Sequence, residues 1–96
     1  MIISFADKAT EDLYHGVSSA RVRRLPQQIL ESALYKLDIL NAAQTLDDLR
    51  WPPGNRLESL KGNFSELHII RINSQWRIVF RWEASNAYEV KILDYH

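Results

Sequence analysis

The chain has 96 residues, no cysteine, and 12 basic side chains against 12 acidic ones, which gives a formal net charge of zero. With 46% hydrophobic residues it has the composition of one globular domain, which we expect to span residues 1–96. The absence of cysteine excludes disulfides and thiolate metal sites. No apolar run approaches the ~18 residues of a membrane helix, so we expect a cytoplasmic protein with no membrane partner.

The zero net charge hides an asymmetry between the two halves of the chain. Residues 1–49 carry five basic and seven acidic side chains, whereas residues 50–96 carry seven basic and five acidic ones. Within residues 50–81 the balance is six basic against two acidic. A polyanion responds to local charge at short range. The second half can therefore bind nucleic acid although the whole chain is neutral.

The first residues predict a short strand and then a helix. Residues 2–5 have the composition of a strand, and Asp7 is a suitable N-cap for a helix that runs to His15. Gly16 follows as a left-handed residue that ends the helix. The basic run at residues 21–24 is expected to be a solvated loop, with contact to a partner or to RNA as the less favoured alternative.

A longer helix is expected to begin at Pro26, which fits the first turn of a helix. Thr45 with Asp48 resembles a capping box for one further short turn, which Pro52 and Pro53 end. The longer helix should be the main cover of the core. Its apolar residues recur at three- and four-residue spacing, at Ile29, Leu30, Ala33, Leu34, Leu37 and Leu40.

The second half of the chain follows the two-residue period that is typical of strands. We expect strands at residues 57–61, 67–72, 76–82 and 87–95. Helices first and a β-meander second predict an α+β domain. Its N-terminal helices should pack on one face of a mainly antiparallel sheet of four to five strands. The intervening turns are expected at residues 62–63, 73–75 and 84–86.

The alternation of apolar residues predicts the register of the first hairpin. It places Ile70 opposite Ile78 and Arg71 directly opposite Arg77. Guanidinium groups that face each other across strands repel, by a few tenths to ~1 kcal/mol, unless an anion lies between them. Together with Lys61 they form the kind of cationic group that holds the oxygens of a phosphodiester. The alternative is a basic sheet face that is only solvated.

The second hairpin gives its arginine a partner within the sheet. A three-residue loop, with Asn86 as its left-handed residue, places Trp82 beside Tyr88 and Arg81 beside Glu89. The pattern therefore predicts that this arginine is neutralised. The two arginines of the first hairpin have no acidic partner by the same reasoning.

The chain ends on a carboxylate, a phenol and an imidazole, at Asp94, Tyr95 and His96. We expect all three to reach the edge of the predicted sheet, where they could share proton transfers. An imidazole that titrates near neutrality is suited to be a general acid or base. The alternative for the histidine is a frayed terminal residue with no role.

The remaining titratable candidates have both functional and structural interpretations. Glu58 is bracketed by Arg56 and Lys61, which would keep it ionised and fit for a base role. It can equally be an ordinary surface residue in a salt bridge. His15 and His68 are assigned to structure, because one ends a helix and the other lies on an apolar strand face. The three histidines have no metal-ligand spacing, so we predict no metal.

Residues 52–96 contain, in this order, PPGNRLE, LKG, RIN, QWRI and a terminal DYH. In combination these motifs resemble the HigB-type toxins, the plasmid maintenance system killer proteins of the RelE/ParE superfamily. The resemblance implies a ribosome-dependent endoribonuclease that cleaves mRNA in the decoding site and inhibits translation, without metal or cofactor. It also implies a helix-turn-helix antitoxin of the HigA type, through which the complex binds operator DNA.

The chemistry of that family is attack of the RNA 2′-hydroxyl on the adjacent phosphate, which needs a base, an acid and cationic stabilisation. Carried over by position, Arg77 stabilises the phosphate, and Asp94, Tyr95 and His96 form the acid/base group. Some relatives have His before Pro-Leu-Lys-Gly where this chain has Glu58. Two pairings stay open: Glu58 as base with His96 as acid, and His96 with Asp94. The supporting phosphate-binding cations are Arg56, Lys61 and Arg71.

Two further functions are compatible with the same fold. A gyrase-poisoning toxin of the ParE type shares it, acts by binding a protein, and lacks a nuclease triad. The other is an inert partner-binding module whose toxin site has decayed. The facing arginines and the terminal imidazole favour the nuclease over the gyrase-poisoning toxin.

Overall fold

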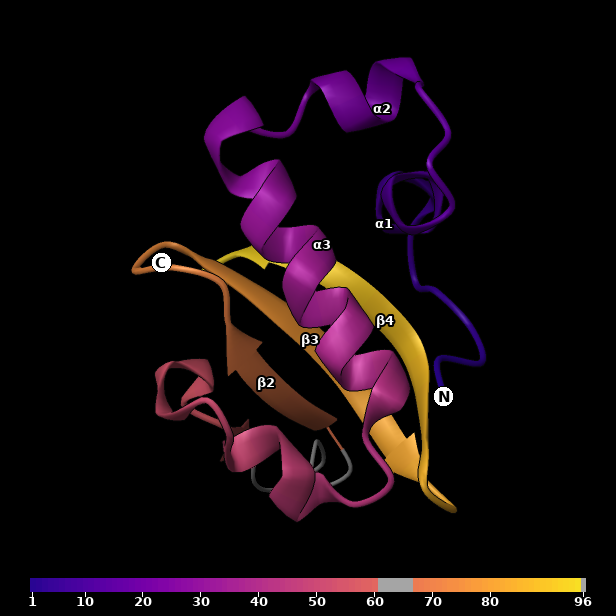
Figure 1. Cartoon of the computed structure of the whole chain (residues 1–96). Helices are drawn as coiled ribbons and strands as arrows, with labels where there is room; N and C mark the ends of the chain where they lie inside the picture. The colour runs from indigo at the N-terminus through magenta and orange to yellow at the C-terminus, as the bar shows by residue number, and fades with distance from the viewer. Residues whose placement is uncertain (61–66, 96) are drawn as a thin grey trace.

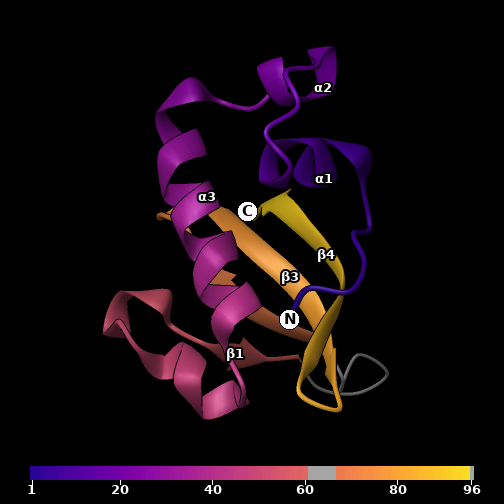
Figure 2. The ribbon, with the colours of Figure 1, turned by 45° about the vertical axis from the view of Figure 1, so that its right-hand side comes forward.

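The fold is taken from a computed structural model, which describes residues 1–60 and 67–95 (Figure 1). A four-stranded antiparallel sheet in the order β1-β2-β3-β4 carries the helices on one face (Figures 1 and 2), as predicted for the α+β class. No helix in these two ranges is long and apolar enough to cross a membrane. The elements are α1 Lys8–Tyr14, α2 Ala20–Arg23, α3 Gln27–Ala42, the 3₁₀ helices η1 Leu46–Arg50 and η2 Pro53–Asn55, β1 Glu58–Ser59, β2 Leu67–Arg71, β3 Trp76–Glu83 and β4 Asn86–Asp94.

The first helix has the ends that its sequence predicts. The Asp7 carboxylate accepts a hydrogen bond from the Thr10 amide at 2.9 Å, and His15 is the C-cap. Gly16 follows with φ +73°, a conformation that glycine adopts at little cost. The buried Thr10 hydroxyl accepts a hydrogen bond from the Ile92 amide at 2.9 Å, so α1 is attached directly to β4.

The strand predicted at residues 2–5 is wrong. The segment makes only two isolated parallel bridges to β4, Ile2 with Ala87 and Phe5 with Val90, in place of a continuous ladder. These contacts nevertheless cover the outer edge of β4 from Ala87 to Val90 (Figure 2). The segment therefore protects one edge of the sheet from pairing with another chain.

The loop predicted at residues 21–24 is also wrong, because Ser19 caps a short helix there. Its hydroxyl accepts a hydrogen bond from the Val22 amide at 3.3 Å. The longer helix α3 begins at Gln27, so Pro26 is its N-cap and not part of its first turn as predicted, and Leu34 is 36% exposed. Leu34 lies about 100° around the helix axis from Ala33, beyond the stripe that meets the sheet. The apolar part of that stripe is Ile29, Ala33, Leu37 and Leu40.

The core lies between α3 and one face of the sheet. The predicted alternation on β3 is confirmed, since Ile78 and Phe80 are fully buried against the helices while Arg77 and Arg81 lie on the opposite face. We refer to that opposite side as the open face. Each buried aliphatic or aromatic side chain contributes roughly 1.5–3 kcal/mol. This packing fixes which side of the sheet Arg77 and Arg81 occupy.

The capping box predicted at Thr45 and Asp48 is confirmed, although the turn it begins is a 3₁₀ helix. The Thr45 hydroxyl accepts from the Asp48 amide at 3.3 Å, and the Asp48 carboxylate accepts from the Thr45 amide at 3.1 Å. The Gln44 amide donates to the same carboxylate at 2.9 Å. These backbone donors hold the pKa of Asp48 below its ordinary value.

A buried amide fixes the chain that leads into β1. Asn55 is fully buried, and its Nδ2 donates to the carbonyls of Leu49 at 3.1 Å and Trp51 at 3.2 Å. Its Oδ1 accepts a hydrogen bond from the Lys36 ammonium of α3. Burial lowers the pKa of Lys36. β1 itself lies within the predicted strand at residues 57–61, whereas the turn predicted at residues 62–63 lies outside the described residues.

The turn of the second hairpin is shorter than predicted. Ala84 and Ser85, with φ of 51° and 66°, form a two-residue turn, and Asn86 already belongs to β4. Two consecutive left-handed residues are typical of the type I′ hairpin turn, whose twist matches that of the strands. The prediction of a three-residue loop failed because neither residue is the glycine or asparagine that usually marks this turn.

The shorter turn changes the register of the second hairpin. Arg81 pairs with Tyr88 and Trp82 with Ala87, one residue away from the predicted pairs. Further along β3, a bulge between the pairs of Arg81 and Val79 shifts the register back by one residue. Glu89 of β4 lies at this bulge and has φ 54°. Arg81 still reaches the carboxylate of Glu89 at 3.6 Å. The predicted neutralisation of Arg81 is thus confirmed although the predicted register is wrong.

Candidate functional site

The predicted register of the first hairpin is confirmed. Arg71 of β2 pairs with Arg77 of β3, and Ile70 pairs with Ile78. Both arginines are half-buried on the open face. The sequence therefore places two guanidinium groups side by side on neighbouring strands.

The turn between the two strands supplies an acceptor that the sequence analysis missed. Arg71 Nε donates to the backbone carbonyl of Asn73 at 3.0 Å, and Arg77 Nη1 donates to the same oxygen. Arg77 Nη1 also donates to the Trp76 carbonyl at 3.2 Å. A shared carbonyl explains how the two cations lie together, but it is neutral. No carboxylate in residues 1–60 and 67–95 forms an ion pair with either arginine, so within this part of the chain the pair keeps its two positive charges.

Tyr95 lies beside this pair. The guanidinium carbon of Arg77 is 5.3 Å from the centroid of the Tyr95 ring, within the range of a cation–π contact. The Tyr95 amide donates to the carbonyl of Gln75 at 2.7 Å, and its side chain is 43% exposed. A predicted acid/base residue and the predicted phosphate-binding arginine are thus in contact.

Asp94 is attached to the same turn. The side-chain amide of Gln75 donates to both carboxylate oxygens of Asp94, at 3.2 Å each. Asp94 pairs with Trp76 at the end of β4 and is exposed to solvent. The turn at residues 73–75 therefore contacts four of the predicted site residues, Arg71, Arg77, Asp94 and Tyr95.

Glu58 and Arg56 are not joined to this group. Glu58 of β1 pairs with Ile69 of β2. It is therefore displaced from Arg71 by one strand spacing of ~4.8 Å across the sheet and by two residues, ~7 Å, along the strand. From Arg77 it is separated by two strand spacings. Arg56 precedes β1 with φ 47° and is exposed. Within residues 1–60 and 67–95, neither side chain makes a hydrogen bond or an ion pair. The other two predicted site residues, Lys61 and His96, lie outside the described residues.

The interior histidine has the structural role that the sequence predicts. His68 is buried beside Phe80, with 5.8 Å between ring centroids, and its Nδ1 is 2.8 Å from the Ser59 hydroxyl. Burial lowers the pKa of His68, so the neutral imidazole is favoured. No group of three His, Asp or Glu side chains in the described part of the chain is arranged to hold a metal ion.

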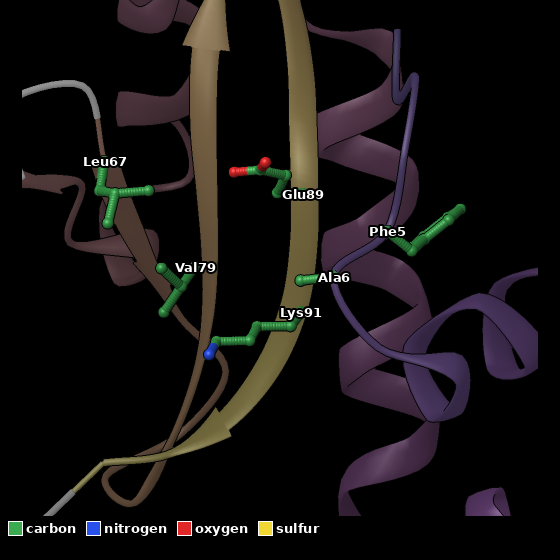
Figure 3. A pocket seen from close by; sticks show the side chains of 6 residues that line it. All are labelled: Phe5, Ala6, Leu67, Val79, Glu89 and Lys91. Carbon is green, nitrogen blue, oxygen red and sulfur yellow. The ribbon is translucent and has the colours of Figure 1, made fainter.

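A hollow of about 420 Å³ lies further along the sheet from the arginine pair. Leu67 and Val79 line one side of it, and Glu89 and Lys91 extend from β4 toward β3 on the other (Figure 3). Ala6 contributes from the N-terminal segment. Val79 neighbours Lys91 across the strands, two residues from Arg77. The hollow thus continues the open face beyond the arginines with both apolar and charged groups.

Sequence reasoning missed Asn73 and Gln75 as parts of the site. It identified residues 73–75 as a turn, which is correct. The asparagine itself was the available signal, because an Asn side chain that accepts from amides further along the chain builds a defined turn. Which carbonyl that turn directs at the arginines could not be derived from composition.

Comparison with known proteins gives a consistent result. A family model described as "RelE-like toxin of type II toxin-antitoxin system HigB" matches residues 3–96. The chain is 44% identical over 82 residues to "Toxin HigB-1" of Vibrio cholerae, covering 85% of this chain and 84% of that protein. It is 33% identical over 73 residues to an uncharacterised protein of Haemophilus influenzae, covering 76% and 71% respectively.

Among solved structures, the fold is similar to that of the YoeB-YefM complex from Staphylococcus aureus. The TM-score is 0.61, the identity is 14%, and the match covers 100% of this chain and 98% of that one. At this identity the likeness shows a shared fold. The family match over residues 3–96 and the 44% identity to a HigB toxin show that the chain belongs to the HigB-like family of RelE-like toxins of type II toxin-antitoxin systems.

Proposed function

We propose that residues 1–96 form one toxin domain that cleaves mRNA on the ribosome, without a metal, and so inhibits translation. The observation that carries the proposal is the pairing of Arg71 with Arg77 on the open face, next to Tyr95. Within the described residues the pair has only backbone carbonyls and an aromatic ring as partners. A site of this kind attracts an anion.

The reaction is attack of a ribose 2′-hydroxyl on the adjacent phosphate. The hydroxyl loses its proton to a base, the bond to the 5′-oxygen breaks, and that oxygen takes a proton from an acid. The non-bridging oxygens gain negative charge in the transition state, where the forked donors of Arg71 and Arg77 stabilise it. Removal of one such donor typically lowers kcat by roughly 10²–10³-fold.

Of the two acid/base pairings we propose His96 with Asp94, supported by Tyr95. Asp94 and Tyr95 are both attached to the turn that holds the arginines. Glu58 lies two strands from Arg77 and makes no hydrogen bond or ion pair with this group in the described part of the chain. Its role in the proposal is therefore a peripheral one, as is that of Arg56.

We also propose a helix-turn-helix antitoxin of the HigA type as the partner that neutralises the toxin in the cytoplasm. Family membership supports an antitoxin, and a structure of similar fold is a complex named for two components, YoeB and YefM. Through that antitoxin the complex would bind operator DNA. Coexpression of the proposed HigA-type antitoxin should restore growth of induced cells, and continued arrest would contradict the pairing.

The proposal is tested by mapping mRNA 5′ ends after brief induction of the toxin. The wild type should produce new 5′ ends within translated regions, and Arg77→Ala should abolish them. Arg81→Ala is the matched control, because Arg81 lies on the same strand and the same face of the sheet as Arg77 but contacts two carboxylates. Cleavage by purified protein should need translating ribosomes. Rapid cleavage of free RNA, or new 5′ ends in the Arg77→Ala strain, would contradict the proposal.

A further inference from the structure

We infer that the turn at residues 73–75 positions both halves of the proposed site, with Asn73 and Gln75 as its positioning residues. The inference rests on the proposed function. One half is the pair of guanidinium groups, and the other is the Asp94–Tyr95 segment. Asn73 and Gln75 do not need to touch RNA in this role, since they act through the residues they hold.

The Asn73 side chain determines the shape of the turn. Its Oδ1 accepts hydrogen bonds from the amides of Gln75 and Trp76, at 2.8 Å each. The amides of Ile72 and Asn73 both donate to the Trp76 carbonyl, at 2.9 and 3.2 Å, and close the turn from the other side. An Asn side chain that accepts amides in this way holds a turn that the backbone alone would leave loose.

The turn places the Asn73 carbonyl where both guanidinium groups can donate to it. Arg71 uses only Nε and Arg77 uses only Nη1 in this contact. A guanidinium carries five N–H donors, so most donors of the pair have no protein partner within the described residues. Because a carbonyl has no net charge, it aligns the two forks without neutralising them. The pair is thus oriented before a phosphate arrives, which avoids reorganisation during the reaction.

Gln75 links the turn to the second half of the site. Its side chain donates to both oxygens of Asp94, and its carbonyl accepts from the Tyr95 amide at 2.7 Å. The Tyr95 ring then lies against the guanidinium of Arg77. The contacts form a closed circuit from the turn through Arg77 and Tyr95 back to the turn. A movement of the turn therefore displaces the phosphate-binding and proton-transfer groups together.

The two positioning residues should give different kinetic signatures. Asn73→Ala removes two hydrogen bonds and frees the carbonyl that aligns the arginines. It should weaken binding and lower kcat by about tenfold each. Gln75→Ala leaves the guanidinium pair on its carbonyl but loosens Asp94. It should lower kcat about tenfold and leave binding within about twofold.

The experiment uses the full chain with ribosomes that hold a short message. Binding is measured with a message that is 2′-O-methylated at the codon in the decoding site, because the methyl group blocks the attacking hydroxyl and prevents cleavage. The value of kcat is measured with the unmodified message. Asn73→Ser should recover most of what Asn73→Ala loses, because a serine hydroxyl can accept hydrogen bonds from the same amides, although these bonds are weaker. Ser74→Ala is the matched control, since the Ser74 side chain makes no hydrogen bond within the described ranges. Thermal melting checks that every variant is folded.

Each outcome shows whether Asn73 and Gln75 position the proposed site or only stabilise the fold. The inference is supported if Asn73→Ala loses both binding and kcat while folded, if Asn73→Ser recovers them, and if Gln75→Ala loses kcat alone. It is overturned if both alanine variants match Ser74→Ala, or if their losses only follow the unfolded fraction. If the wild type binds the methylated message but cleaves nothing, the nuclease proposal fails and the binding arm still tests Asn73. If the wild type does neither, both fail.

Discussion

The two ends of β3 repeat the same pair of residue types on the open face. At one end the guanidinium of Arg77 lies 5.3 Å from the Tyr95 ring, and at the other that of Arg81 lies 4.6 Å from the Tyr88 ring. An arginine packed on an aromatic ring is held in place at either end. The packing alone therefore does not distinguish a binding site from a structural contact.

The charges around the two arginines are different. Arg81 contacts the carboxylates of Glu83 at 2.6 Å and Glu89 at 3.6 Å. Arg77 contacts backbone carbonyls and pairs with Arg71 across the strands. The comparison teaches that the counter-charge is what differs between the two ends. Arg81 is neutralised within the fold, whereas no carboxylate among the described residues pairs with Arg77, which supports the proposal that its charge meets a ligand.

Lysine substitutions at the two ends should give the largest contrast. Arg77→Lys keeps the charge but loses the planar fork that can hold two phosphate oxygens, so kcat on translated message should fall by about 10²-fold. Arg81→Lys should retain wild-type kcat within about twofold, since its charge is already balanced. Cleavage is followed by primer extension on ribosomes programmed with one message. Equal losses in the two variants would remove the distinction between the two ends.

Phenylalanine substitutions test the two rings in the same way. Tyr95→Phe keeps the ring beside Arg77 and removes only the hydroxyl, so kcat should fall roughly tenfold if the phenol takes part in proton transfer. Binding of an uncleavable message should be unchanged. Tyr88→Phe is the matched control at the other end of β3 and should be active. If Tyr95→Phe is fully active while Tyr95→Ala is not, the ring only supports Arg77.

The contrast should reverse when stability is measured in place of activity. Arg81→Ala removes contacts with two carboxylates and a ring, and should lower the free energy of unfolding by about 1 kcal/mol. Arg77→Ala loses hydrogen bonds to carbonyls but relieves repulsion with Arg71, so its effect should stay within about 0.5 kcal/mol. Urea denaturation measures both. A larger loss in Arg77→Ala than in Arg81→Ala would assign Arg77 to the fold.

The sequence was sufficient for the first hairpin because two of its signals agree. The apolar alternation excludes a register shift of one residue, which would place Arg71 on the face of Ile78, and the turn at residues 73–75 sets the loop length, so Arg71 pairs with Arg77. The second hairpin was not predictable in this way. Its turn uses Ala84 and Ser85 in left-handed conformations that their residue types do not favour, and a bulge near Glu89 then corrects the register.

The candidate site was also predictable only in part. The arginines and the Asp94–Tyr95 segment carry their chemistry in their side chains, so a pattern of residue types can identify them. The carbonyl of Asn73 belongs to the backbone, which every residue has, and its position depends on a turn that only the folded chain defines. The short helix α2 was missed for a related reason, since a four-residue helix has no apolar period.

The smallest expected effect is also the most direct measure of which charge meets the RNA. For single-stranded nucleic acid, the logarithm of the binding constant falls with the logarithm of the salt concentration with a slope of about −0.7 per phosphate contact. Arg77→Ala should flatten the slope for an uncleavable message by about 0.7, and Arg81→Ala should leave it unchanged. Fluorescence anisotropy with a labelled message across a range of KCl concentrations provides the slopes. A flattened slope in Arg81→Ala would mean that RNA displaces the carboxylates of Glu83 and Glu89, and that both ends of β3 bind the message.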